Sequence, residues 1–94
     1  MAEVHLPRSL IALYPSAERR TSVEASNVAE VMTALDARWP GMRDRLCEPG
    51  PAIREFINVF VDGEPADLDT SLGPAAIVHI IPAVAGGESR MPAR

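Results

Sequence analysis

The sequence contains no lysine, because all nine of its basic residues are arginines. The chain therefore has no side-chain amine for a Schiff base, for binding phosphate through lysine, or for lysine-linked modification. Basic residues are also outnumbered: thirteen acidic residues give a formal net charge of -4 at pH 7. This charge disfavours a nucleic acid or an anionic membrane as the main partner.

Cysteine is almost absent as well. Cys47 is the single cysteine, so no intramolecular disulfide can form. A structural zinc site takes about four Cys or His ligands, whereas Cys47, His5 and His79 are far apart in the sequence. We therefore expect no bound metal and no bound cofactor, and we interpret Cys47 as a small packed side chain.

Long hydrophobic runs are also lacking. The N-terminal segment reaches Pro7 before any extended apolar stretch, which is not typical of a signal peptide. The longest apolar stretch, residues 75–85, contains His79 and Pro82 and is too short to cross a bilayer. We expect a cytoplasmic protein.

The length and composition indicate one small folded domain. The chain has 94 residues, of which 47% are hydrophobic. Two domains of ordinary size would need a longer chain, and a disordered chain would be less apolar.

A helix is predicted from Val28. Asn27 is followed three residues later by Glu30, which is the spacing of a capping box. Apolar residues then recur at steps of three and four, and Pro40 with Gly41 should end the helix. The apolar stripe consists of Val28, Val31, Met32, Leu35 and Trp39. A further helical turn over residues 42–48 should place Met42 and Leu46 beneath it.

Strands are predicted on both sides of this helix. Residues 3–7 alternate in polarity and pair with residues 21–25 in a first hairpin, joined through apolar residues at a bend. Residues 48–52 are predicted to form a loop. Residues 54–67 are predicted to form the strongest strand, with a turn at Asp62 and a short return strand. Residues 77–84 are predicted to form a last strand inside the sheet. The order predicts an α+β fold, with one helix across one face of a mixed sheet.

Alternation along the strands predicts which side chains face outward. If Ile57, Val59 and Val61 pack on the helix, Phe60 must point to the opposite face. On the last strand, His79 and Ile81 should point outward in the same way. We predict that Phe60, His79 and Ile81 form an exposed patch that binds a partner. No acid or nucleophile is placed to make His79 a catalytic base.

The chain closes with an unusual tail. The last strand leads through Val84 and Ala85 to Gly86 and Gly87, and the segment ESRMPAR follows at residues 88–94. Composition alone is typical of a frayed terminus. Because Gly86 and Gly87 have no Cβ, they also form the narrowest possible segment of polypeptide, which can enter a tight enzyme channel.

These residues resemble a known family. The order of elements, the segment FINVFVDGE and above all PAVAGG at residues 82–87 are similar to the ubiquitin-like sulfur carriers of the ThiS and MoaD type, and especially to the CysO-like carriers. The resemblance covers residues 4–87. It implies a β-grasp fold over residues 1–87 and a protein that is a co-substrate rather than an enzyme.

The resemblance also implies a chemistry for the tail. An adenylating enzyme of the ubiquitin-activating type would use ATP to convert the terminal carboxylate of Gly87 into an acyl-adenylate. A sulfur donor would then displace AMP to leave a thiocarboxylate, which donates sulfur to a biosynthetic enzyme. The narrow segment that leads Gly87 to the enzyme would consist of Gly86, Ala85 and Val84. The product, whether cysteine, a thio-sugar or another secondary metabolite, or molybdopterin, stays open.

Two features depart from the family pattern. Residues 72–75 read Leu-Gly-Pro-Ala, where many relatives have an acidic Gly-Asp turn. The family's active end is a free Gly-Gly, but here seven residues follow Gly87. We therefore predict that a metalloprotease of the JAMM type cuts between Gly87 and Glu88 and removes the extension.

Two other classes of function remain. A ubiquitin-like modifier would be joined to target amines instead of donating sulfur. A non-covalent interaction domain would have a tail without chemistry. A stand-alone enzyme is disfavoured, because no nucleophile, base and orienting group can be assembled from these residues.

Overall fold

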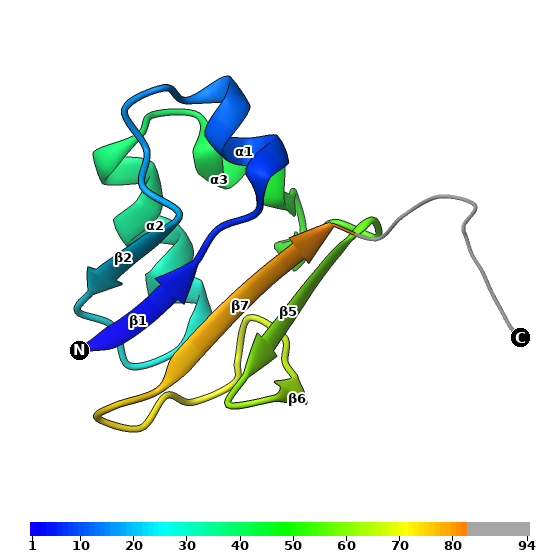
Figure 1. Cartoon of the computed structure of the whole chain (residues 1–94). Coiled ribbons are helices and arrows are strands. Elements are labelled where there is room, and N and C mark those ends of the chain that lie inside the picture. The colour runs from blue at the N-terminus through cyan, green and yellow to red at the C-terminus, as the bar shows by residue number, and fades with distance from the viewer. Residues whose placement is uncertain (83–94) are drawn as a thin grey trace, which may run out of the picture.

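The computed structural model describes residues 1–82, and its centre is a mixed five-stranded sheet (Figure 1). The strand order is β2-β1-β7-β5-β6. β7 lies in the middle, parallel to β1 and antiparallel to β5. The predicted mixed sheet with an interior last strand is therefore confirmed. The strands are β1 (Ala2–His5), β2 (Arg20–Val23), β5 (Ile57–Val61), β6 (Glu64–Pro65) and β7 (Ile77–Pro82).

The main helix, α2 (Val28–Arg38), forms where the capping pattern predicts it. The Asn27 side chain accepts a hydrogen bond from the backbone N–H of Glu30 at 2.9 Å. The Glu30 carboxylate in turn accepts from the backbone N–H of Ser26 at 2.7 Å. Two N–H groups at the start of the helix are thereby satisfied. At the other end, Gly41 takes a φ of 96°, which suits a residue without a Cβ.

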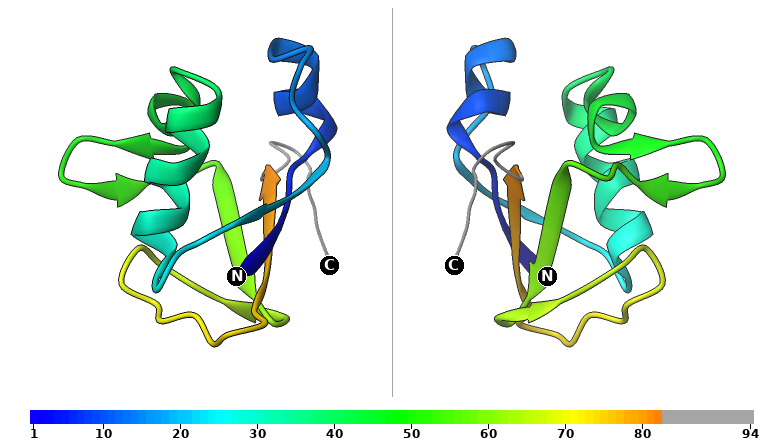
Figure 2. Two further views of the ribbon diagram at one scale, coloured as in Figure 1. Left: turned by 90° about the vertical axis from the view of Figure 1, so that its left-hand side faces the viewer. Right: turned by 90° about the vertical axis from the view of Figure 1, so that its right-hand side faces the viewer.

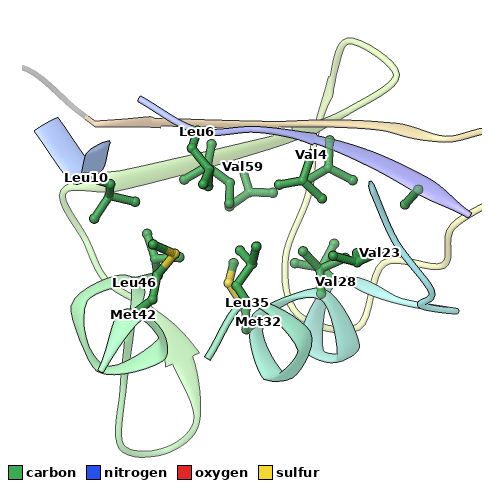
Figure 3. Close-up of a cluster of buried hydrophobic side chains, with 14 of the residues drawn as sticks. Val4, Leu6, Leu10, Val23, Val28, Met32, Leu35, Met42, Leu46 and Val59 are labelled. Atoms are coloured by element: carbon green, nitrogen blue, oxygen red, sulfur yellow. The ribbon is translucent and has the colours of Figure 1, made fainter. Parts of the chain in front are cut away.

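The core fills the space between α2, the following helix α3 (Met42–Leu46) and one face of the sheet (Figure 3). Met32 and Leu35 of α2 and Met42 and Leu46 of α3 are fully buried. The predicted position of Met42 and Leu46 beneath the main helix is therefore confirmed. Removing such a side chain from water contributes about 1.5–3 kcal/mol each.

Two short elements correct the sequence prediction. Residues 8–13 form a helix, α1 (Arg8–Leu13), in the connection predicted as a bend. Its six residues are too few for a helix that is stable by itself; the burial of Leu10 in the core holds it in place. The predicted loop at residues 48–52 is instead part of a small hairpin in which β3 (Cys47–Glu48) pairs with β4 (Ala52–Ile53).

The turn at Asp62 forms as predicted and ties two strands together. Asp62 and Gly63 have φ values of 51° and 88°, the left-handed conformations of a tight hairpin turn. The Asp62 carboxylate accepts a hydrogen bond from the backbone N–H of Ile77 at 2.9 Å. This turn marks one end of the molecule, and Figure 2 shows α1, α3 and the end of β7 at the opposite end.

Candidate functional site: the outward sheet face and the root of the tail

The predicted tail begins where the central strand ends. Val84, Ala85, Gly86 and Gly87, with the predicted cleavage site at Gly87 and Glu88, lie outside the described residues. Pro82, the last residue of β7, is therefore the root of the tail. Pro82 pairs with Ile57, and this pairing holds Pro82 beside the start of β5.

The three residues of the predicted patch lie together on the outward face of the sheet. Phe60 and His79 occupy directly paired positions on β5 and β7, and Ile81 is two residues closer to the tail than His79. Ile81 is 45% exposed, while Phe60 and His79 are half-buried. Val59, Val61, Val78 and Ile80 are buried on the other face. The alternation predicted from the sequence is therefore confirmed, and we call Phe60, His79 and Ile81 the outward patch.

The structure adds His5 to the neighbourhood of this patch. Parallel pairing of β1 with β7 sets His5 beside His79, with ring centroids 4.5 Å apart. The Nε2 atom of His5 lies 2.5 Å from a carboxylate oxygen of Glu3, which is 3.6 Å from Nε of Arg20. Alternation in the first strand places His5 outward, but sequence alone did not reveal that it pairs with His79.

Cys47 is a packed side chain, as its isolated position suggested. It is buried at the start of β3. Burial raises the pKa of its thiol above the ordinary value of 9.0, although Arg43 and Arg54 act in the opposite direction. A buried thiol with a raised pKa is a poor nucleophile at neutral pH.

Within residues 1–82, no three His, Cys, Asp or Glu side chains are grouped so as to hold a metal ion. No helix in this part of the chain is long and apolar enough to cross a membrane.

The chain matches a known protein family over most of its length. Residues 4–87 match the ThiS family. The chain belongs to this family. The match starts in β1 and ends at the second glycine of the tail, so the segment from Glu88 onward lies beyond it.

Relatives and solved structures agree with the family. Sulfur carrier protein CysO of Mycobacterium tuberculosis is 26% identical over 85 residues, which covers 84% of this chain and 91% of the relative. CysO in the BexX/CysO complex of Amycolatopsis orientalis is 26% identical, with a TM-score of 0.83 over 93% of this chain and 100% of the other. SAMP1 from Haloferax volcanii is 25% identical, with a TM-score of 0.71 over 92% and 98%.

The fold is thus the ubiquitin-like β-grasp, and the chain is of the ThiS/MoaD type and similar to CysO. These similarities support a sulfur-carrier function. They are also consistent with a carrier rather than a catalyst, since proteins of this type are small carriers.

Proposed function

We propose that this protein carries sulfur as a thiocarboxylate on Gly87, after removal of residues 88–94. The observation that supports this proposal is the end of the family match at Gly87. Pro82 is held in the sheet, and the five residues from 83 to 87 can span at most about 16–18 Å. The tail is therefore long enough to bring its terminal carboxylate into an enzyme channel while the domain stays outside.

The proposed chemistry proceeds in two steps. A carboxylate oxygen of Gly87 attacks the α-phosphorus of ATP on an adenylating enzyme of the ubiquitin-activating type, and pyrophosphate leaves. A sulfur donor then attacks the acyl carbon, and AMP leaves with the bonding electron pair. Adenylation is needed because a free carboxylate is a poor electrophile.

Processing must come before this chemistry. As encoded, Gly87 is joined to Glu88 by an amide and has no carboxylate. We propose a JAMM-type metalloprotease for the cut. A chain from its own host that still carries residues 88–94, yet supports sulfur transfer, would contradict this step, and the intact mass of the isolated protein tests it.

The acceptor is proposed to be a biosynthetic enzyme. The Amycolatopsis orientalis relative is found in a complex with BexX, which supports a carrier that docks on an enzyme. The outward patch is the proposed contact surface, because it lies on the same strand as the root of the tail.

The decisive experiment uses the chain ending at Gly87, the adenylating enzyme, ATP and a sulfur source. We expect a mass gain equal to the replacement of one oxygen by sulfur. The full chain and a chain ending at Gly86 are the controls, and neither should gain this mass. Unchanged protein with several competent adenylating enzymes would refute the proposal.

A protein modifier is the second candidate, because the SAMP1 structures of Haloferax volcanii belong to a small archaeal modifier protein. In that case the tail would be joined to amines of target proteins. A gel shift that survives thiol and denaturant would favour conjugation. Unchanged function after deletion of residues 86–94 would instead favour a non-covalent interaction domain.

A further inference from the structure

A second surface surrounds the root of the tail and is separate from the outward patch. A pocket of about 420 Å³ opens at the end of the molecule where β7 stops. Its walls come from α1, α3, the segment that leads into β5, and one end of the β5–β7 pair, where Ile57 begins β5 and Pro82 ends β7. Figure 1 shows α1 and α3 close to this end of β7.

The pocket contains apolar side chains that are exposed among residues 1–82. Leu13 is 52% exposed and Phe56 is 57% exposed, and both line the pocket together with the half-buried Ile57. Five large hydrophobic residues are exposed among residues 1–82, and only Met1 is more exposed than Leu13 and Phe56. Two of them therefore meet at one pocket beside the tail, which is typical of a surface that binds a partner.

The rim of this pocket is mostly cationic. Arg45 and Arg54 lie on it with a single acid, Asp44. Nε of Arg54 donates to the backbone carbonyl oxygen of Asp44 at 2.8 Å, whereas Arg45 is exposed on α3. The ion pairs recorded within residues 1–82 join Glu3 to His5 and to Arg20, so Arg45 has no carboxylate partner in this part of the chain.

The opposite end of the molecule has the opposite charge. Residues 24–30 and 62–76 meet there, through the bridge between Asn27 and Ser71. These two segments contain no arginine. They contain six acidic residues, namely Glu24, Glu30, Asp62, Glu64, Asp67 and Asp69. An overall acidic chain alone would suggest a basic rim on the enzyme that takes the tail, but half of the twelve acidic residues within residues 1–82 lie at this end, away from the tail.

We propose that the pocket beside Pro82 docks the adenylating enzyme, through an apolar side chain of that enzyme flanked by a carboxylate. The apolar group would fill the space between Leu13 and Phe56, and the carboxylate would meet Arg45. A channel that takes Gly87 lies within about 16–18 Å of Pro82, so the surface around Pro82 is close to the enzyme in the proposed reaction. The inference rests on the proposed function for the identity of the partner.

The test measures direct binding and activation separately. The chain ending at Gly87 is titrated with the adenylating enzyme by calorimetry, and thiocarboxylate formation is followed by intact mass. The double variant Leu13→Ser/Phe56→Ser should bind roughly tenfold or more weakly. Its circular dichroism and thermal midpoint should match those of the control Ala12→Ser, an exposed change on the same helix.

The charged rim is tested with a matched pair. Arg45→Gln and Glu64→Gln each remove one exposed charge, at opposite ends of the molecule. Arg45→Gln should weaken binding and reduce its dependence on salt, because the paired carboxylate loses its partner. Glu64→Gln should leave the affinity nearly unchanged. Equal effects of both variants would refute the acidic contact.

The outcomes separate this inference from the proposed function. Normal binding by a folded double variant would overturn the docking pocket, even if the wild-type chain becomes thiocarboxylated. If the wild-type chain binds the enzyme, the double variant does not, and no thiocarboxylate forms on the wild-type chain, the docking pocket stands and the proposed chemistry is refuted. If the wild-type chain self-associates and the double variant does not, the pocket binds a second copy of the chain, and the inference is overturned. Absence of any wild-type binding would overturn both.

Discussion

Phe60 lies directly across from His79 on the antiparallel strands β5 and β7, and both side chains face away from the core. The pairing follows from the register fixed at Asp62, whose backbone and carboxylate both bond to Ile77. Because directly opposite residues in a sheet have neighbouring Cβ atoms, the turn determines which side chains gather on the outward face.

Replacing Phe60 with Asp should weaken binding to the acceptor enzyme and sulfur transfer by roughly tenfold or more without unfolding the domain. A charge would then replace an apolar contact in the proposed interface. The control is Ser16→Asp, which adds the same carboxylate to an exposed position between α1 and β2. Binding assays and thermal melts check both variants. Loss of the folded state in Phe60→Asp would show that Phe60 belongs to the core.

Asn27→Ala should lower the free energy of unfolding by about 1 kcal/mol, because the N–H of Glu30 loses its acceptor at the start of α2. Urea unfolding measures the change. Thr33→Ala in the middle of the same helix is the matched control, since it alters an exposed side chain and should cost less. An equal loss in both variants would argue against a specific role of the cap.

Gly63→Ala and Gly73→Ala should differ, although a Cβ would meet open space at both positions. Gly63 has a φ of 88°, where a residue with a Cβ costs roughly 1–2 kcal/mol. Gly73 has no such positive φ, so alanine there should be neutral or slightly stabilising. Urea midpoints for the two variants test the difference. A stable Gly63→Ala variant would mean that the turn can change its conformation.

Cys47 should react slowly with iodoacetamide in the folded protein at pH 8 and rapidly in urea. Burial raises the pKa of the folded thiol above 9.0, so the unfolded chain loses this proton first as the pH rises. The stability associated with the neutral thiol is therefore complete below pH 9 and decreases above it. Unfolding measured against pH should show a smaller decrease for Cys47→Ala. Fast labelling of the folded protein would contradict the buried position.

The sequence by itself determined the local elements with the strongest patterns. Asn27 and Glu30 specify the start of α2 through hydrogen bonds made within four residues. Alternation along β5 and β7 specifies which side chains face the core, because successive residues of a strand point to opposite faces. The Gly-Gly tail lies outside the described residues, and its role stays a prediction from the absence of side chains.

Only the tertiary structure decided the rest. The helix α1 is six residues long and depends on the burial of Leu10, which is a contact with residues far away in the sequence. The same holds for the tilted ring contact between His5 and His79, which comes from strands more than seventy residues apart. Leu13, Phe56 and Pro82 line one pocket because parallel and antiparallel pairing bring three separate segments to one end of the sheet. Sequence patterns describe neighbours along the chain, whereas a surface is formed by neighbours in space.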